Sequence, residues 1–165
     1  MQIDLNELAR FLVTAKRRTY AGDGKELTNP QRPDFKELVF EDGLWNYRDS
    51  YTGYFMAPGQ EVVRFDEKPV WVMSYWGGML HEFSGDRVLA RETFDFLKKA
   101  LRGVSLDAPF RGPRNFTLEN FRYSSSYEGD ITDFNGAESI MKDMEFGART
   151  VFRQKFGGGL VIPKS

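Results

Sequence analysis

The 165-residue chain contains no cysteine and a single histidine, His81. The absence of cysteine excludes disulfides, thiolate nucleophiles, iron–sulfur clusters and cysteine zinc sites. With one histidine, a histidine-rich metal site is excluded as well. We therefore expect no metal ion and no cofactor, and the sequence identifies no catalytic residue.

Long apolar runs and a strong charge of either sign are also missing. No apolar run approaches the roughly 20 residues needed to span a bilayer. The first ten residues carry Asp4, Glu7 and Arg10 instead of an apolar signal core. The 23 basic and 24 acidic residues give a net charge of −1, whereas phosphate binding needs a basic surface. We expect a soluble, cytoplasmic chain that binds no membrane and, by itself, no nucleic acid.

Aromatic residues are the feature that the chain has in excess. The 15 Phe, 7 Tyr and 3 Trp make up 15% of the sequence. Such large side chains favour sheet-rich packing or an aromatic-lined pocket. Hydrophobic residues at 41% and charged residues at 28% are ordinary for a globular domain, and the length fits one domain.

Two amphipathic helices and two sets of strands are predicted. The first helix begins after the N-cap Asp4 and ends near residues 20–22, and the second covers 90–102. Gly- and Pro-rich loops follow each helix, at 22–33 and 105–114. The predicted strands are 38–41, 44–51, 60–65 and 69–76 in the first half, and 116–123, 127–133, 138–142, 149–156 and 160–162 in the second. Gly77-Gly78 is expected to end the run at 69–76.

The two halves share landmarks in the same order. The matched pairs are Tyr47 with Tyr123, Tyr51 with Tyr127, Gly53 with Gly129, Glu61 with Glu138, and residues 75–78 with 155–158. We predict an α+β fold in which one domain, residues 1–165, consists of two tandem helix-plus-antiparallel-hairpin repeats at about 4–80 and 89–162. The repeats would pack about a pseudo-twofold axis. Chance is the alternative, because glycine and aromatic residues recur in any hairpin-rich protein.

Six segments carry a family resemblance: FLVTAKRRTYAGDG, YRDSYTG, GQEVV, PVWVMSYWGG, FLKKALRGV and FNGAESI…VFRQKFGGGLV. Together they resemble an uncharacterised family of small bacterial and archaeal domains. In that family the domain occurs alone or behind a helix-turn-helix DNA-binding module. The resemblance implies a sensory or effector domain and supplies neither an activity nor catalytic residues. No such helix pair precedes Met1, so we do not expect this chain itself to regulate transcription.

One candidate binding surface is a row of side chains on the strand 69–76. Side chains alternate between the two faces of a strand, so Trp71, Met73 and Tyr75 share one face. The match between the halves aligns this row with the one that carries Arg153 and Lys155, two cations that favour a solvent-facing row. We interpret the row as an open contact surface for a ligand or partner. The alternative is that a helix covers the row and that it belongs to the core.

The second candidate is the repeated glutamate. Glu61 and Glu138 each lie on an otherwise apolar row, where burial requires a partner and raises the pKa of a carboxyl group. Neighbouring rows carry Tyr47, Asp49 and Tyr51 in the first half and Tyr123 and Tyr127 in the second. A carboxylate in an aromatic cage is a receptor for an organic cation. The alternative is that each glutamate, placed just after a turn, is solvated or caps a backbone amide.

These features rank three classes of function. A small-molecule-binding or sensor module comes first, a protein interaction or oligomerisation module such as a homodimer second, and a carboxylate-based enzyme third. The ten candidate ligand-binding residues are Tyr47, Asp49, Tyr51, Glu61, Trp71, Met73, Tyr75, Tyr123, Tyr127 and Glu138.

Overall fold

The computed structural model describes residues 3–22 and 24–164, which form two helices and one eight-stranded antiparallel sheet. The elements are α1 (Leu5–Arg18), β1 (Lys36–Asp42), β2 (Trp45–Tyr51), β3 (Gly59–Phe65), β4 (Lys68–Met79), the 3₁₀ turn η1 (His81–Phe83), α2 (Arg87–Leu101), β5 (Asn115–Leu118), β6 (Phe121–Asp130), β7 (Asp133–Met144) and β8 (Gly147–Leu160). The predicted α+β class is confirmed. Neither helix is long and apolar enough to cross a membrane.

Both helices begin at an aspartate cap. Asp4 accepts hydrogen bonds from the backbone N–H groups of Asn6 and Glu7, as its predicted N-cap role requires. The second helix begins at Arg87, earlier than the predicted start at residue 90. The reason is that the Asp86 carboxylate caps it in the same way.

The strands of the first half follow the predicted hairpins, with one correction. Gly77 and Gly78 do not end the strand, because β4 continues through them to Met79. A Cβ atom at Gly77 would lie 2.2 Å from the Arg153 carbonyl oxygen, so glycine here allows a close approach of two backbones. The pair therefore continues the sheet instead of breaking it.

In the second half the predicted boundaries were less accurate. The predicted strand 116–123 is divided into β5 and β6 by a tight turn in which Glu119 has a φ of 52°. The predicted short strand at 160–162 is wrong, because Leu160 is the last residue of β8. The turn between β5 and β6 was missed because its polar residues lie inside an aromatic-rich run and gave too weak a signal.

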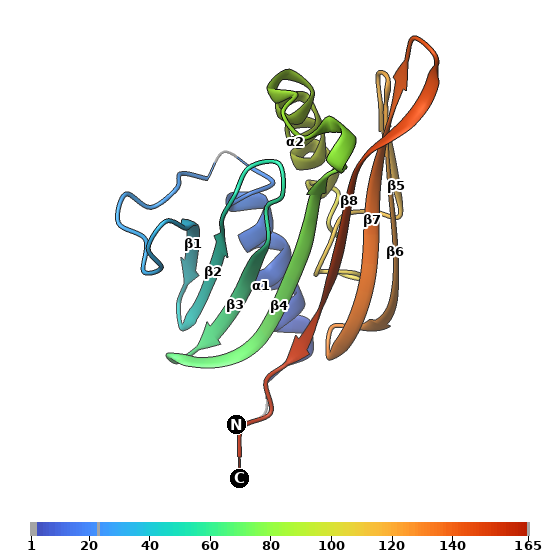
Figure 1. Cartoon of the computed structure of the whole chain (residues 1–165). Coiled ribbons are helices and arrows are strands. Elements are labelled where there is room, and N and C mark those ends of the chain that lie inside the picture. Colours follow the sequence, from blue (N-terminus) through green and yellow to red (C-terminus); the bar gives the residue numbers. More distant parts are fainter. Residues whose placement is uncertain (1–2, 23, 165) are drawn as a thin grey trace.

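The sheet order is β1-β2-β3-β4-β8-β7-β6-β5, so each half of the chain contributes one helix and four adjacent strands. The halves meet where β4 pairs with β8, with Tyr75 opposite Phe156. Figure 1 shows the sheet strongly curved, with both helices on the same side of it. The inner face of the sheet therefore packs against α1 through one half and against α2 through the other.

The proposed open surface at Trp71, Met73 and Tyr75 is wrong: Trp71 and Met73 are fully buried and Tyr75 is partly buried against the same core. Met73 pairs with Glu61 and Gln154 pairs with Glu138, so the β8 residues on the glutamate's face are Gln154 and Phe156, and not Arg153 and Lys155. The sequence match that aligned Met73 with Arg153 is one residue out of register with these ladders. The runs Gly77-Gly78 in β4 and Gly157-Gly158-Gly159 in β8 allow the alignment to slide by one position, and a slip of one residue exchanges the faces of a strand.

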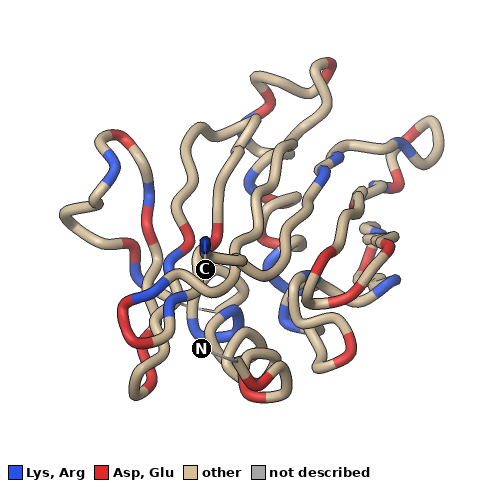
Figure 2. The backbone as a smooth tube through the Cα atoms, turned by 90° about the horizontal axis from the view of Figure 1, so that it is seen from below, with Lys and Arg blue, Asp and Glu red and all other residues tan. Residues whose placement is uncertain are grey.

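Charged residues of both signs are interspersed along the fold. In Figure 2, blue and red segments alternate around the backbone, and the helices and hairpins carry both. This distribution follows from the nearly equal numbers of acidic and basic residues. The charges that matter for the site are the few that lie beneath the sheet.

The continuous sheet gives a testable expectation for cooperativity. Because β4 and β8 join the two halves through a long ladder of paired residues, neither half has an independent sheet edge at that point. We expect urea unfolding to be a single transition, with coincident midpoints by far-UV circular dichroism and by tryptophan fluorescence. Two separated midpoints would show instead that the halves unfold as independent units.

Candidate functional site

A cavity of about 230 Å³ lies between the two helices and the inner face of the sheet. Its floor comes from β2, β3 and β4, and its walls come from α1, α2 and the segment 102–114. Apolar cavities of about 150 Å³ hold a benzene ring, so this space suits a ligand the size of one ring with a short substituent. The floor is polar, and three buried carboxyl groups lie in it or beside it.

The first of these carboxyl groups belongs to Glu61, which forms a buried ion pair with Lys16. Lys16 follows Leu12 by one turn on the buried face of α1, so the helix itself carries the ammonium group beneath the sheet. The Lys16 Nζ atom lies 5.9 Å from the ring centroid of Tyr47 and 5.9 Å from that of Trp71. Burial lowers the pKa of Lys16, and the Glu61 carboxylate acts in the opposite direction.

The second carboxyl group belongs to Glu138, and Arg111 binds it with two hydrogen bonds. Arg111 Nε lies 2.9 Å from Oε2, and a terminal guanidinium nitrogen lies 2.5 Å from Oε1. The Tyr123 hydroxyl donates a further bond of 2.7 Å to Oε2. Burial alone lowers the pKa of Arg111, but the Glu138 carboxylate outweighs it and holds that pKa well above its usual value. Arg111 and Glu138 therefore neutralise one another's charge through two parallel hydrogen bonds.

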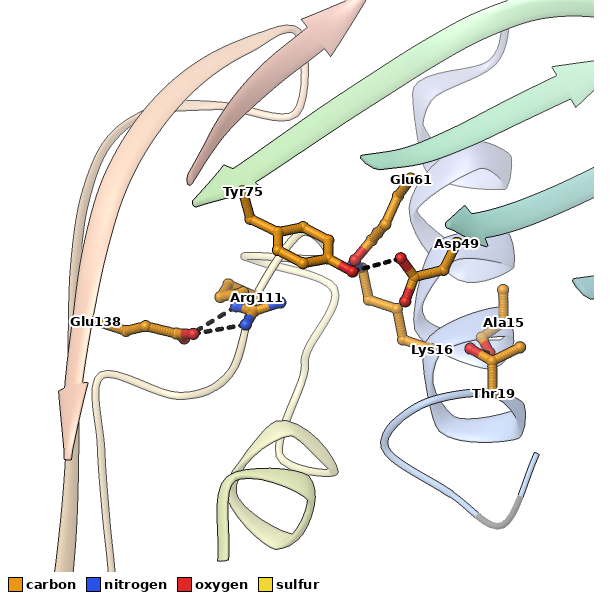
Figure 3. A network of polar contacts seen from close by, with 8 residues as sticks. All are labelled: Ala15, Lys16, Thr19, Asp49, Glu61, Tyr75, Arg111 and Glu138. Atoms are coloured by element: carbon orange, nitrogen blue, oxygen red, sulfur yellow. Dashed lines mark hydrogen bonds and ion pairs between the residues drawn. The ribbon is translucent and has the colours of Figure 1, made fainter. Parts of the chain in front are cut away.

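The third carboxyl group, Asp49, has no cation of its own. It lies opposite Glu61 in the β2–β3 ladder, is 3% exposed, and accepts a 2.7 Å hydrogen bond from the Tyr75 hydroxyl. Figure 3 shows these three side chains converging with Lys16, while Arg111 points toward Glu138. Among the residues that the structure describes, none forms an ion pair with Asp49.

Burial determines how the Asp49 carboxyl group titrates. Burial raises the pKa of its carboxyl group to about 7, and the neighbouring Glu61 carboxylate acts in the same direction. The Tyr75 hydrogen bond and the charges of Lys16 and Arg111 oppose this rise without cancelling it. Near neutral pH the Asp49 carboxyl is therefore partly protonated, since two adjacent buried carboxylates with one nearby ammonium do not both ionise freely.

Gln154 on β8 adds a second incomplete polar group to the lining of the cavity. Its side chain is 5% exposed, and within residues 3–22 and 24–164 its Nε2 atom has no hydrogen-bond partner. A buried amide N–H without a partner costs about 1–3 kcal/mol, so such groups usually contact a water molecule or a ligand. The cavity therefore contains two polar groups, Asp49 and Gln154, that the protein alone leaves incompletely satisfied.

The structure brings together five of the ten candidate residues in this cavity. They are Tyr47, Asp49, Tyr51, Glu61 and Tyr75. The other five do not line it. Trp71 and Met73 lie in the core. Glu138 accepts hydrogen bonds from Arg111 and from Tyr123. Tyr127 packs against Phe110 and beneath the guanidinium group of Arg114.

Two expectations about the glutamates are corrected. The alternative that they are solvated is wrong, because Glu61 and Glu138 are each 3% exposed. The aromatic cage around Glu61 exists, but the chain's own Lys16 ammonium lies in it. An external cation therefore has no free position beside Glu61.

Several cavity residues were not among the sequence candidates, notably Lys16, Tyr20, Phe94, Arg111 and Gln154. Lys16 had a usable signal, because it occupies a position on the apolar face of its helix. Arg111 lies in a loop, and Gln154 depends on the register of β8. Neither position is determined by a local sequence pattern.

Comparisons with known proteins give one positive result. A family described as Domain of unknown function (DUF5680) matches residues 49–161, which is more than half of the chain, so the chain belongs to this family. The match begins at Asp49 and does not include α1, which supplies Lys16. The searches of curated proteins and of solved structures found no match.

The titration of Asp49 predicts a pH-dependent effect of a neutral substitution. Because the folded-state pKa of Asp49 is raised above the unfolded value, the proton contributes stability that is lost as pH rises from about 4 to about 7. Asp49→Asn removes this pH-dependent loss of stability, because the amide does not ionise. The amide oxygen can still accept the hydrogen bond from the Tyr75 hydroxyl. At about pH 8 we expect the variant to melt at a higher temperature than wild type, by roughly 2–4 °C for each kcal/mol gained in the free energy of unfolding. At about pH 4 the two melting temperatures should differ little.

The matched control is Asp107→Asn, which changes an exposed aspartate outside the cavity. Its melting temperature should follow that of wild type at every pH. Parallel curves for wild type and Asp49→Asn across this range, measured by differential scanning calorimetry, would contradict the raised pKa.

Proposed function

We propose that this member of the family is a small-molecule-binding module and that its ligand occupies the cavity between α1, α2 and the sheet. The observation that carries the proposal is the combination of a cavity beneath the sheet with two incomplete polar groups, Asp49 and Gln154. Apolar walls with a few convergent polar groups are typical of ligand sites. A sensor or effector role would follow if ligand binding altered how the domain contacts another protein.

The cavity lining supports a ligand with an apolar body. The tyrosine and phenylalanine residues that line it include Tyr20, Tyr51, Tyr54 and Phe94, and Leu97 and Leu101 extend the apolar wall from α2. Tyr20 and Tyr51 meet edge to face, with ring centroids 6.0 Å apart. Such side chains contribute contact area at low entropic cost and leave hydroxyl groups for polar contacts.

We also propose that the domain is one unit that arose by duplication, with its two repeats related by an approximate twofold axis. In support, Glu61 lies opposite Met73 in one ladder and Glu138 lies opposite Gln154 in the other, an alignment that matches Tyr75 with Phe156. Tyr75 and Phe156 face each other in the central strand pair, as residues on a twofold axis must. The tyrosines Tyr47 and Tyr123 then occupy equivalent positions beside the two glutamates.

A blocked cavity provides the test of binding. Ala57 lines the cavity and is half-buried, so Ala57→Trp places a large ring in the space that a ligand would use. We expect benzyl alcohol, at millimolar concentration, to shift the amide NMR signals of cavity residues in wild type and not in Ala57→Trp. Millimolar affinity is the expected range for so small a ligand.

Ala148→Trp is the control, because it adds the same ring at an exposed position near the start of β8, outside the cavity lining. It should bind the probe as wild type does. If single-ring probes of every charge failed to shift cavity signals in the wild-type protein, the proposed function would be excluded for ligands of this size.

A protein interaction module remains the second candidate, and it is favoured by one residue. Trp76 on the outer face of β4 is 64% exposed, beside Met56, which is 41% exposed. Both line a broad groove that also contains Arg153 and Lys155. An exposed tryptophan in a groove is typical of contact surfaces, and self-association through this face is the simplest form of the proposal.

Self-association predicts a concentration-dependent size. We expect size-exclusion chromatography with light scattering to show a dimer of wild type that Trp76→Ser converts to a monomer, since an interface would lose its central aromatic contact. Phe146→Ser removes a 94% exposed ring from the β7–β8 turn and should leave the dimer intact. A monomer of wild type at every concentration would rule out this second candidate.

A further inference from the structure

We propose that the ligand of the cavity is an organic monocation, a primary amine on a small ring or short apolar chain, whose ammonium group binds the Asp49 carboxylate. This inference rests on the proposed binding function and names the ligand's chemical class. It follows from how the buried charges balance, from an ammonium site that the protein already contains, and from the unpaired amide at Gln154.

The charge balance identifies Asp49 as the group that needs a partner. Lys16 neutralises Glu61, and Arg111 neutralises Glu138. The remaining carboxyl, that of Asp49, receives only the neutral Tyr75 hydroxyl. With Asp49 ionised, these five buried side chains carry one net negative charge, which a single ligand ammonium would cancel. The other charged residues that line the cavity lie at its exposed or half-buried rim: Glu26, Lys36, Arg91, Asp95 and Lys98. An anionic ligand would face an unpaired carboxylate instead.

The neighbouring Lys16 shows how an ammonium group is accommodated in this part of the fold. Its Nζ atom contacts the Glu61 carboxylate and lies 5.9 Å from the ring centroids of Tyr47 and Trp71. Asp49 lies directly across the β2–β3 ladder from Glu61, on the same inner face. A ligand amine at Asp49 would therefore repeat, on the cavity side, the combination of carboxylate and aromatic rings that already holds Lys16.

Gln154 supplies an independent reason to expect a ligand here. Its amide lines the same cavity, is almost completely buried, and has an Nε2 atom without a partner in the described parts of the chain. A Gln side chain presents either an N–H donor or a carbonyl acceptor when it turns over. It can therefore bind a second polar atom of the ligand, or the ammonium group itself.

Binding of a cation by Asp49 must be linked to protonation. The charged groups that act on Asp49 are Glu61 from β3, Lys16 from α1 and Arg111 from the loop before β5, and Tyr75 from β4 donates a hydrogen bond to it. Three further tyrosines interact with the Asp49 charge: Tyr20, Tyr47 and Tyr51. A cation binds the ionised carboxyl, so its affinity increases with pH until Asp49 has lost its proton, near pH 7. A neutral ligand that accepts a hydrogen bond from the protonated carboxyl would show the opposite dependence.

The test compares three probes that share one ring: benzylamine, benzyl alcohol and benzoate. We expect benzylamine to bind wild type at least about tenfold more tightly than benzyl alcohol at about pH 8, and benzoate to bind most weakly. Between about pH 5 and pH 8 the affinity for benzylamine should rise by about tenfold or more, while that for benzyl alcohol stays level or falls. NMR titration of the full chain measures all three.

Asp49→Asn separates the inference from the proposed function. The variant should lose the preference for benzylamine and its pH dependence while it still binds benzyl alcohol. Equal affinity of wild type for benzylamine and benzyl alcohol, or a preference that survives in Asp49→Asn, would overturn the inference and leave the binding function standing. Absence of binding by all three probes would overturn both. If the variant does not fold, the pH series on wild type decides alone.

Discussion

The burial of charged side chains beneath the sheet is the constraint on which the rest of the structure depends. An isolated charge in a protein interior is so unfavourable that it must be paired or neutralised. Around the cavity, the described chain meets this requirement twice by pairing, through Lys16 with Glu61 and through Arg111 with Glu138. It meets the requirement a third time at Asp49 by protonation, because no further cation of the described chain reaches that carboxyl.

The two ion pairs and Asp49 differ in how much the fold depends on their charges. Removing one partner of a buried ion pair costs about 3–5 kcal/mol, a large part of a typical stability of about 5–15 kcal/mol. The two pairs are therefore requirements of the fold, whatever the protein binds, and variants of Glu61 or Glu138 report mainly on stability. Asp49 is different, because a pKa of about 7 leaves its carboxyl group partly neutral near neutral pH. In the proposed function, it is the position at which charge serves a ligand.

The two halves of the chain differ in the charged groups that they bring to the cavity. Both halves keep a glutamate and a tyrosine at equivalent ladder positions, yet their cations come from different sources. Lys16 extends from α1, whereas the aligned position of α2 holds the apolar Leu101, and Arg111 reaches Glu138 from the following loop. Asp49 is likewise matched by Ser125, which carries no charge. The acidic anchor of the cavity is consequently present in the first half only.

Local patterns in the sequence determined the two helices, the hairpins of the first half and the α+β class, because capping residues, turn residues and apolar periodicity act over a few neighbouring residues. They also indicated that Glu61 and Glu138 needed partners on apolar rows. Register and packing were decided only by the tertiary structure. The glycines of β4 and β8 allow a slip of one residue, and only the completed ladders place Trp71 inside and Trp76 outside. Likewise, the pKa of Asp49 rises only because the folded chain buries this carboxyl group beside Glu61. The sequence could not show this, since electrostatic partners are set by distance in space and not by distance along the chain.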